Sequence, residues 1–194
     1  MRLFVALDLA EGVRRALAEL IVKLKPKSSG ARWVNAENLH VTLKFIGHIE
    51  NDKLRPIQEV LGKIHSDQVV DLQFRGMGFF PNEFHPRVIW CGVAASPNLA
   101  ALAADIDRAL EPIGIEGEGK PYTPHLTLAR FKTEAGVPEL VNAANEMKSY
   151  DFGEARETSF HLYESLLKPS GAQYNRLASY PIVGDSTSSE VKAK

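Results

Sequence analysis

One tetrapeptide pattern, His-apolar-Thr-Leu, occurs twice in the chain, as His40-Val41-Thr42-Leu43 and as His125-Leu126-Thr127-Leu128. Successive side chains of a β-strand point to opposite faces, so each tetrapeptide places its His and Thr on one face and its two apolar residues on the other. We therefore expect two strands, each with a polar face and a core face. Brought together, these strands would place two imidazoles and two hydroxyls around one small site.

The order of elements around the two tetrapeptides is the same. Apolar spacing predicts a strand over 3–9, a helix over 11–24 and the first His-x-Thr strand over 39–46, and then a strand over 87–93, a helix over 96–110 and the second His-x-Thr strand. This repetition favours an α+β fold with a bilobal, pseudo-twofold arrangement of two antiparallel-rich sheets. Helices would cover the outer sides, and the polar faces would line a cleft between the sheets.

The rest of the chain fits one domain of this kind. Further elements are expected as a helix over 51–64, a strand over 69–74, a short helix over 138–147 and strands over 158–166 and 174–182. We expect residues 1–184 to form a single two-lobed domain. Residues 185–194 begin with a small, polar run, which is typical of a disordered tail.

Composition and charge exclude several classes of protein. The 23 Lys and Arg residues balance 24 Asp and Glu residues, so the protein as a whole has no positive potential that would attract nucleic acid. Any contact with nucleic acid must therefore come from a local group of basic residues. The single cysteine, Cys91, rules out an internal disulfide and a Cys-based zinc site, and its apolar neighbours predict burial. The first residues are too soon interrupted by charge for a signal peptide or membrane span. We expect a cytoplasmic monomer with no membrane contact.

Five segments around the tetrapeptides resemble a known family. They are Arg2-Leu3-Phe4-Val5-Ala6-Leu7-Asp8, residues 37–47 from Glu37 to Gly47, Arg87-Val88-Ile89-Trp90, residues 124–130 from Pro124 to Arg130, and Leu162-Tyr163-Glu164-Ser165. Through these segments, and also Trp33-Val34, the chain resembles the two-histidine phosphoesterase superfamily. Within that superfamily it is most similar to the bacterial and archaeal RNA 2',3'-cyclic phosphodiesterases, also called 2'-5' RNA ligases.

This resemblance implies a fold and an activity. The implied fold is bilobal, with the two His-x-Thr strands facing each other across a cleft. The implied activity is hydrolysis of a 2',3'-cyclic phosphate at an RNA end to a 2'-phosphate, without metal or other cofactor. In vitro, the reverse reaction would join tRNA halves through a 2'-5' bond.

The candidate site residues fit this chemistry independently of the family. Opening a cyclic phosphodiester needs a base on one side of phosphorus and an acid on the other, and histidine titrates near neutrality. His40 and His125 are therefore the catalytic candidates, and the Thr42 and Thr127 hydroxyls are candidate donors to the non-bridging oxygens. Arg130 is a candidate phosphate clamp. Its odd spacing from His125 requires a strand end or a bulge to bring it to the same face.

The family's 2'-phosphate product implies which histidine plays which part. His125 would be the base that activates water, and His40 the acid that protonates the 3' oxygen. A 3'-phosphate product would reverse the two roles.

Other residues have competing interpretations. In strict alternation Lys44 shares the face of His40, where it would either steer phosphate or lie in solvent. The remaining histidines show no metal-binding spacing and are expected to be surface or structural; they are His48, His65, His85 and His161. Five aromatic residues offer faces for base stacking, although packing is the favoured interpretation; they are Trp33, Phe79, Phe80, Phe84 and Trp90.

Two other functions stay open from the sequence. One is a phosphodiesterase that acts on a small nucleotide cyclic phosphate, and the other is a non-catalytic module that binds RNA ends. Intact His and Thr in both tetrapeptides argue against the second. The physiological RNA and the balance between hydrolysis and ligation do not follow from the sequence.

Overall fold

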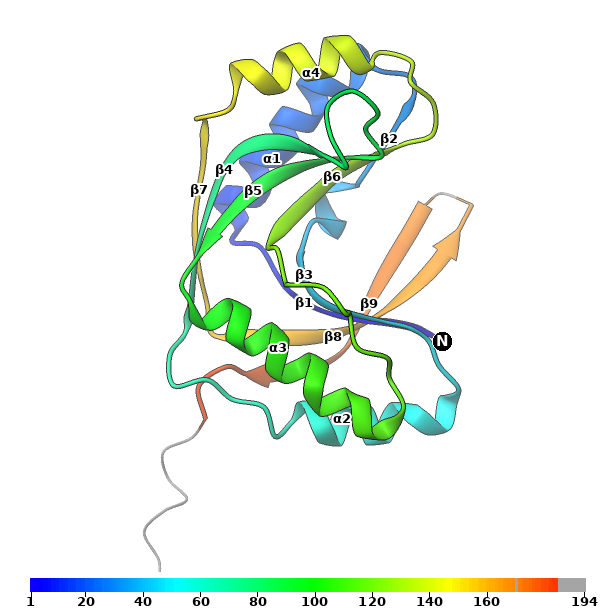
Figure 1. Cartoon of the computed structure of the whole chain (residues 1–194), viewed down its shortest axis with the longest axis vertical. Coiled ribbons are helices and arrows are strands. Elements are labelled where there is room, and N and C mark those ends of the chain that lie inside the picture. Colours follow the sequence, from blue (N-terminus) through cyan, green and yellow to red (C-terminus); the bar gives the residue numbers. More distant parts are fainter. Residues whose placement is uncertain (170, 185–194) are drawn as a thin grey trace, which may run out of the picture.

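Two antiparallel sheets make up the centre of the computed structural model, which describes residues 1–169 and 171–184 (Figure 1). The first sheet has the strand order β3 (Val41–His48), β1 (Arg2–Leu7), β8 (Ser159–Lys168) and β9 (Gly171–Pro181). The second has the order β2 (Ala31–Trp33), β6 (His125–Phe131), β5 (Val88–Ala95), β4 (Val70–Phe80) and β7 (Asp151–Glu157). The expected α+β fold with two antiparallel sheets is confirmed, and the tail expected over 185–194 lies outside the described residues.

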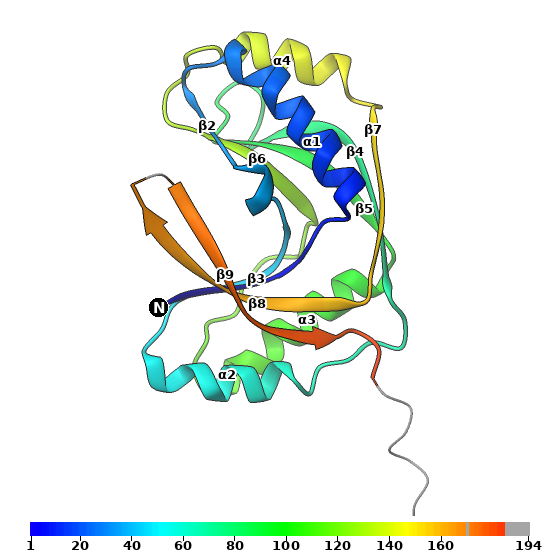
Figure 2. The ribbon, with the colours of Figure 1, turned by 180° about the vertical axis from the view of Figure 1, so that it is seen from behind.

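Within the described residues, four α-helices cover the outer sides of the sheets, as expected (Figures 1 and 2). They are α1 (Glu11–Leu24), α2 (Leu54–Leu61), α3 (Asn98–Leu110) and α4 (Val137–Glu146). Helix α1 packs against β7 and α4 against β4, both in the second sheet, whereas α3 packs against β3 in the first. The helix that precedes each tetrapeptide, α1 or α3, therefore covers the sheet that holds the other tetrapeptide. No described helix combines the length and apolar character needed to cross a bilayer.

Strand β1 shows how the first sheet separates core from cleft. Leu3, Val5 and Leu7 belong to the main hydrophobic core, because alternate side chains of a strand share a face. Phe4 and Ala6 point the other way and form a small separate cluster with Tyr163 and Tyr174. The first sheet thus carries aromatic groups on the side away from its core.

The structure differs from the sequence-based expectation in three strands. Strands β2 and β7 were not expected; they lie at the two edges of the second sheet, and β7 pairs with β4. Strand β4 continues to Phe80, beyond the expected end at residue 74. It can do so because Gly78 lies opposite Trp90, whose ring would be 2.3 Å from a Cβ at this position.

A single residue, Thr158, separates β7 from β8, so the chain passes from the second sheet directly into the first (Figure 1). The expected helix over 51–64 is shorter in the structure. A 3₁₀ turn occupies Asn51–Lys53, and α2 ends at Leu61 before Gly62.

Candidate active site

The two His-x-Thr tetrapeptides meet at a cavity of about 190 Å³. All five predicted site residues line it: His40, Thr42, His125, Thr127 and Arg130. Both sheets contribute to the walls, since β3 carries Thr42 and β6 carries Thr127. Residues that the sequence did not single out for the site also line the cavity, among them Arg2, Phe4, Asn38, Phe45, Ser165 and Tyr174.

The two imidazoles are held by matching hydrogen bonds. Nδ1 of His40 lies 2.7 Å from the carbonyl oxygen of Asn38, and Nδ1 of His125 lies 2.9 Å from the carbonyl oxygen of Thr123. A carbonyl oxygen only accepts hydrogen bonds, so Nδ1 carries the proton in each ring. In the neutral form of each ring, Nε2 is thereby left as the nitrogen that can accept a proton.

Aromatic rings pack against both histidines. The Phe4 ring lies 4.8 Å from that of His40, and the Tyr174 ring meets the same imidazole edge-on at 5.3 Å. Phe80 meets His125 edge-on at 5.1 Å, so of the five aromatic residues considered for base stacking it is the one in ring contact with a candidate catalytic group. Ring packing on two sides fixes the plane of His40.

Burial lowers the pKa of His40, because a charged imidazole loses hydration there. The hydrogen bond to Asn38 and the negative charge of Asp8 act in the opposite direction, and the positive charges of His125 and Arg130 lower the pKa further. The dependence on His125 and Arg130 agrees with their position around the same cavity. His40 therefore favours its neutral form when no anion is bound.

Each His-x-Thr strand contains a bulge, and the bulge determines which residues after the tetrapeptide face the cavity. The pairing of β1 with β3 steps from Ala6↔Thr42 to Val5↔Lys44 and passes over Leu43. The pairing of β5 with β6 steps from Trp90↔Thr127 to Ile89↔Ala129 and passes over Leu128. An extra residue reverses the alternation of the faces beyond it.

The fifth residue after each histidine consequently returns to the cavity, as Phe45 on β3 and Arg130 on β6. The bulge that the position of Arg130 required is present. The same irregularity removes Lys44 from the face of His40, so both sequence-based interpretations of Lys44 are wrong.

Lys44 is instead buried in an ion pair, with a side chain that is 1% exposed. Its Nζ lies 2.5 Å from Oδ1 of Asp107 on α3 and donates to the carbonyl oxygen of Glu116 at 2.6 Å. Farther along the same loop, the Tyr122 hydroxyl donates to the carbonyl oxygen of Thr42 at 2.9 Å. The loop that precedes His125 is thus fixed directly to the strand that follows His40.

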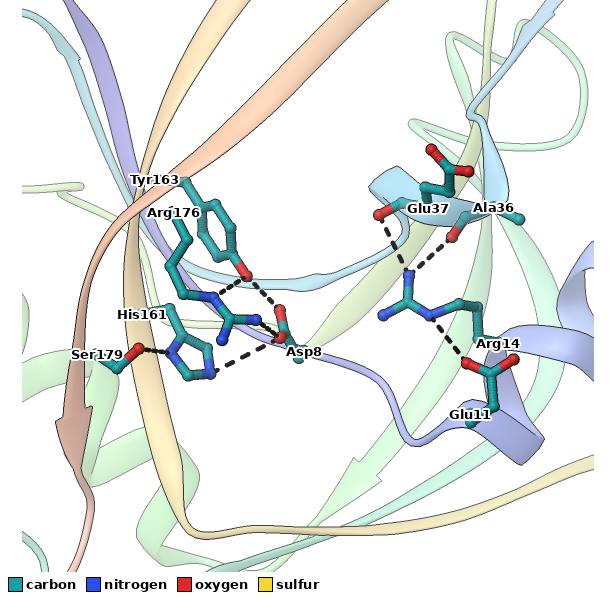
Figure 3. Close-up of polar contacts among 9 residues, drawn as sticks. All are labelled: Asp8, Glu11, Arg14, Ala36, Glu37, His161, Tyr163, Arg176 and Ser179. Carbon is teal, nitrogen blue, oxygen red and sulfur yellow. Dashed lines mark hydrogen bonds and ion pairs between the residues drawn. The ribbon is translucent and has the colours of Figure 1, made fainter.

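The 3₁₀ turn before His40, residues Ala36–Asn38, is held from two sides. Arg14 of α1 donates to the carbonyl oxygens of Ala36 at 2.9 Å and Glu37 at 3.2 Å (Figure 3). Asn38 donates from its side-chain amide to the carbonyl oxygen of Ala172 on β9 at 2.7 Å. Because Asn38 also supplies the acceptor for His40, these contacts position the imidazole.

A polar cluster surrounds Asp8 and is linked to His40 through aromatic rings; Figure 3 shows the cluster around Asp8. The Tyr163 hydroxyl donates to Oδ1 of Asp8 at 2.5 Å, and Arg176 is paired with the same carboxylate and donates to the Tyr163 hydroxyl at 3.2 Å. The Tyr163 ring stacks on Phe4 at 5.3 Å, and Phe4 in turn packs on His40. This cluster holds the aromatic stack that supports the imidazole.

His161 belongs to the same cluster and is a structural histidine, as expected. Its Nδ1 lies 2.9 Å from the Ser179 hydroxyl, and its Nε2 lies 3.8 Å from Oδ2 of Asp8. A separation of 3.8 Å is too long for the orienting hydrogen bond of a Ser-His-Asp triad. Within residues 1–169 and 171–184, no three His, Cys, Asp or Glu side chains are grouped to hold a metal ion.

The remaining sequence-based expectations for single residues agree with the structure except at Phe84, which was expected to pack but is 75% exposed. Cys91 is fully buried, and burial raises the pKa of its thiol to about 12. Two of the residues missed at the site, Phe4 and Tyr174, lie on strands, and the register of each strand decides which face of the sheet they lie on. The available signal was that Phe4, Asn38, Phe45 and other missed residues fall inside the family-like segments, whereas Tyr174 falls in none of them.

Two facing sheets that each carry a His-x-Thr strand define the class of two-histidine phosphoesterases. Within this class the chain belongs to the LigT-like phosphoesterases, because the sequence model of that family matches residues 7–90 and 93–174. An RNA 2',3'-cyclic phosphodiesterase of Methanocaldococcus jannaschii is 36% identical over 174 residues, which cover 90% of this chain and 96% of that protein.

Solved structures show the same fold. A protein of Thermus thermophilus matches with a TM-score of 0.79 and 33% identity, covering 95% of this chain and 100% of that one. E. coli LigT complexed with 3'-AMP matches with a TM-score of 0.76 and 26% identity, covering 94% of this chain and 98% of that one.

Proposed function

We propose that this protein is an RNA 2',3'-cyclic phosphodiesterase, which opens the cyclic phosphate at an RNA 3' end to a 2'-phosphomonoester by acid–base catalysis with His40 and His125. The observation that carries the proposal is the pair of matching Nδ1 hydrogen bonds, to the carbonyl oxygens of Asn38 and Thr123. They leave two Nε2 atoms at one cavity that Thr42 and Thr127 also line. The names of relatives such as the Methanocaldococcus jannaschii enzyme support the RNA substrate.

The proposed reaction needs only these side chains and water. Neutral His125 takes a proton from water at Nε2, and the water oxygen bonds to phosphorus. The bond from phosphorus to the 3' oxygen breaks, and protonated His40 gives its Nε2 proton to that oxygen. Thr42 and Thr127 donate hydrogen bonds to the non-bridging oxygens, where negative charge builds up, and Arg130 pairs with the phosphate.

The surroundings of His40 suit the acid in this scheme once substrate is bound. Asp8 supplies a fixed negative charge that raises the pKa of His40 against the effect of burial. An anionic phosphate in the cavity acts in the same direction. Substrate binding thereby favours the imidazolium form that the leaving 3' oxygen requires.

The proposal is tested with a short RNA that ends in a 2',3'-cyclic phosphate, with products separated by chromatography against 2'- and 3'-phosphate standards. We expect a 2'-phosphate product, and turnover lowered about 10²–10⁴-fold in His40→Ala and in His125→Ala. The double variant is expected to be only slightly slower, because acid and base act as a unit. His65→Ala, on an exposed histidine outside the cavity, is the control.

Several outcomes would contradict parts of the scheme. Full activity in either histidine variant would reject the acid–base pair, and a 3'-phosphate product would reverse the two roles. Activity that is lost in excess EDTA and restored by a divalent ion would reject a reaction carried by side chains alone.

The same groups would support the reverse joining reaction, with a 5'-hydroxyl of RNA in the place of water. A 2'-5' linkage between two RNA fragments, such as tRNA halves, would then form at high concentrations of the ends. Incubation of a cyclic-phosphate RNA with a 5'-hydroxyl RNA, followed by digestion with a nuclease specific for 3'-5' bonds, detects this product.

A further inference from the structure

Two larger cavities adjoin the catalytic one on different sides. The first, of about 650 Å³, shares Asn38, Arg130 and Tyr174 with it and continues to Arg32 and to Lys25 at the end of α1. We name this cavity the basic groove. The second, of about 510 Å³, shares Thr42, Phe45 and His125 with the catalytic cavity and runs along α3. We name it the α3 groove.

Charge distinguishes the two grooves. The basic groove is lined by Lys25, Arg32 and Arg130 and, among the described residues, by no acidic side chain. In the wall of the α3 groove Asp107 and Glu118 balance Lys44 and Lys120, and Lys44 is paired with Asp107. The basic groove therefore attracts a chain of phosphates more strongly than the α3 groove does.

The sheet register places two of the arginines side by side. Arg32 on β2 lies directly opposite Arg130 on β6. Directly paired residues have Cβ atoms about 4.5–5.5 Å apart on one face, and like charges in this arrangement repel. In the described part of the chain, neither side chain forms a hydrogen bond or an ion pair. Two adjacent, uncompensated guanidinium groups would be stabilised by successive phosphates of one strand, one phosphate on each group.

Arg32 also reaches across the groove. A Cβ on Gly171, at the start of β9, would lie 3.9 Å from a terminal nitrogen of Arg32. Its guanidinium therefore lies in the wall between β2 and the β8–β9 hairpin. The exposed apolar side chains of Val22 and Leu167 line the same groove and offer contact surface to bases.

We propose that the basic groove binds the RNA strand on the 5' side of the cyclic end, with Arg32 and Lys25 on the phosphates that precede the terminal nucleotide. The inference rests on the proposed function and makes its substrate an oligonucleotide. A nucleotide with a cyclic 2',3'-phosphate is joined to the rest of the RNA only through its 5' side. One strand therefore has to leave the catalytic cavity, and the groove that begins at Arg130 suits its charge.

The test compares two substrates under steady-state conditions, adenosine 2',3'-cyclic phosphate and a hexanucleotide RNA that ends in a 2',3'-cyclic phosphate. We expect Arg32→Ala and Lys25→Ala each to raise KM for the RNA by up to about tenfold, with a much smaller effect on the mononucleotide. The slope of log kcat/KM for the RNA against log salt should become shallower by about 0.7 for each lost phosphate contact.

Lys23→Ala is the matched control, because Lys23 lies two residues before Lys25 on α1 and outside the basic groove. Lys120→Ala removes a charge from the α3 groove instead. Equal losses on both substrates in Arg32→Ala, or a loss specific to RNA in Lys120→Ala, would overturn the inference.

Failure of the proposed function has a different signature. The unaltered protein would then fail to hydrolyse the RNA. Fluorescence anisotropy with a labelled hexanucleotide that ends in a 2'-phosphate would still test the groove: weaker binding in Arg32→Ala than in Lys23→Ala supports it, and equal binding rejects it.

Discussion

At the residue scale, the chemistry of His40 depends on a balance between burial, which lowers its pKa, and the carboxylate of Asp8, which raises it. Replacing Asp8 by Asn removes the second effect, so the pKa of His40 should fall further. In the pH profile of kcat/KM, the limb that reports the titration of His40 should then move to lower pH, whereas the other limb should stay in place. Steady-state rates across the pH range measure both limbs.

Arg176→Met is the control for that experiment, because it removes a partner of Asp8 while leaving the carboxylate in place. If both variants move the same limb by the same amount, the shift comes from disruption of the cluster rather than from the charge of Asp8.

The two threonines are predicted to act on the transition state rather than on substrate affinity. Thr42→Val and Thr127→Val keep the shape of the side chain and remove the hydroxyl donor. Each should lower kcat by an amount equal to about 2–4 kcal/mol, the range found for other lost oxyanion donors, with little change in KM. Thr133→Val, outside the cavity, is the comparison, and a change confined to KM would assign the hydroxyls to ground-state binding instead.

At the scale of elements, the loop before His125 is held by a buried lysine. Lys44→Ala removes the cation from Asp107 and leaves it the backbone N–H of Glu118 as a hydrogen-bond donor, and we expect a loss of about 2–4 kcal/mol in the free energy of unfolding. The loss is below that of a fully buried pair because the Asp107 side chain is 23% exposed. Urea unfolding followed by circular dichroism measures it.

The exposed pair of Arg55 and Glu59 provides the comparison, since both side chains are more than half exposed. Arg55→Ala should cost no more than about 0.5 kcal/mol. Equal losses in the two variants would mean that Lys44 contributes no more than a surface ion pair.

An element can be predicted from the sequence when the residues that determine it lie within the element itself. Helix α1 follows because Val13, Leu17 and Leu20 recur at helical spacing and Pro26 comes soon after its end. Strand β7 does not, because a polar edge strand takes its conformation from pairing with β4. The bulges at Leu43 and Leu128 depend on register with β1 and β5, so strict alternation misplaced Lys44.

At the scale of the whole molecule, the site depends on contacts between the two halves of the chain, because elements of one half hold the strand that carries the other half's tetrapeptide. The first sheet carries Thr42 and is covered by α3 of the second half, and the Tyr122 loop of the second half bonds to Thr42. The repeated tetrapeptide predicts that the two strands meet. It does not predict these contacts, nor the Phe4 and Tyr174 rings around His40, because they join residues that are far apart in the sequence.

The pH profile of the intact enzyme tests the whole arrangement without any substitution. Hydrolysis requires one imidazole neutral and the other protonated, so kcat/KM should rise and then fall with pH around two values that belong to the pair. Burial lowers the pKa of His40 in the free protein, which moves its limb of kcat/KM below the ordinary value for histidine. A bound phosphate stabilises the imidazolium form, so both limbs of the kcat profile should lie at higher pH than those of kcat/KM. A rate that climbs through alkaline pH with no falling limb would exclude a protonated histidine as the acid, because deprotonation of that histidine must eventually stop the reaction.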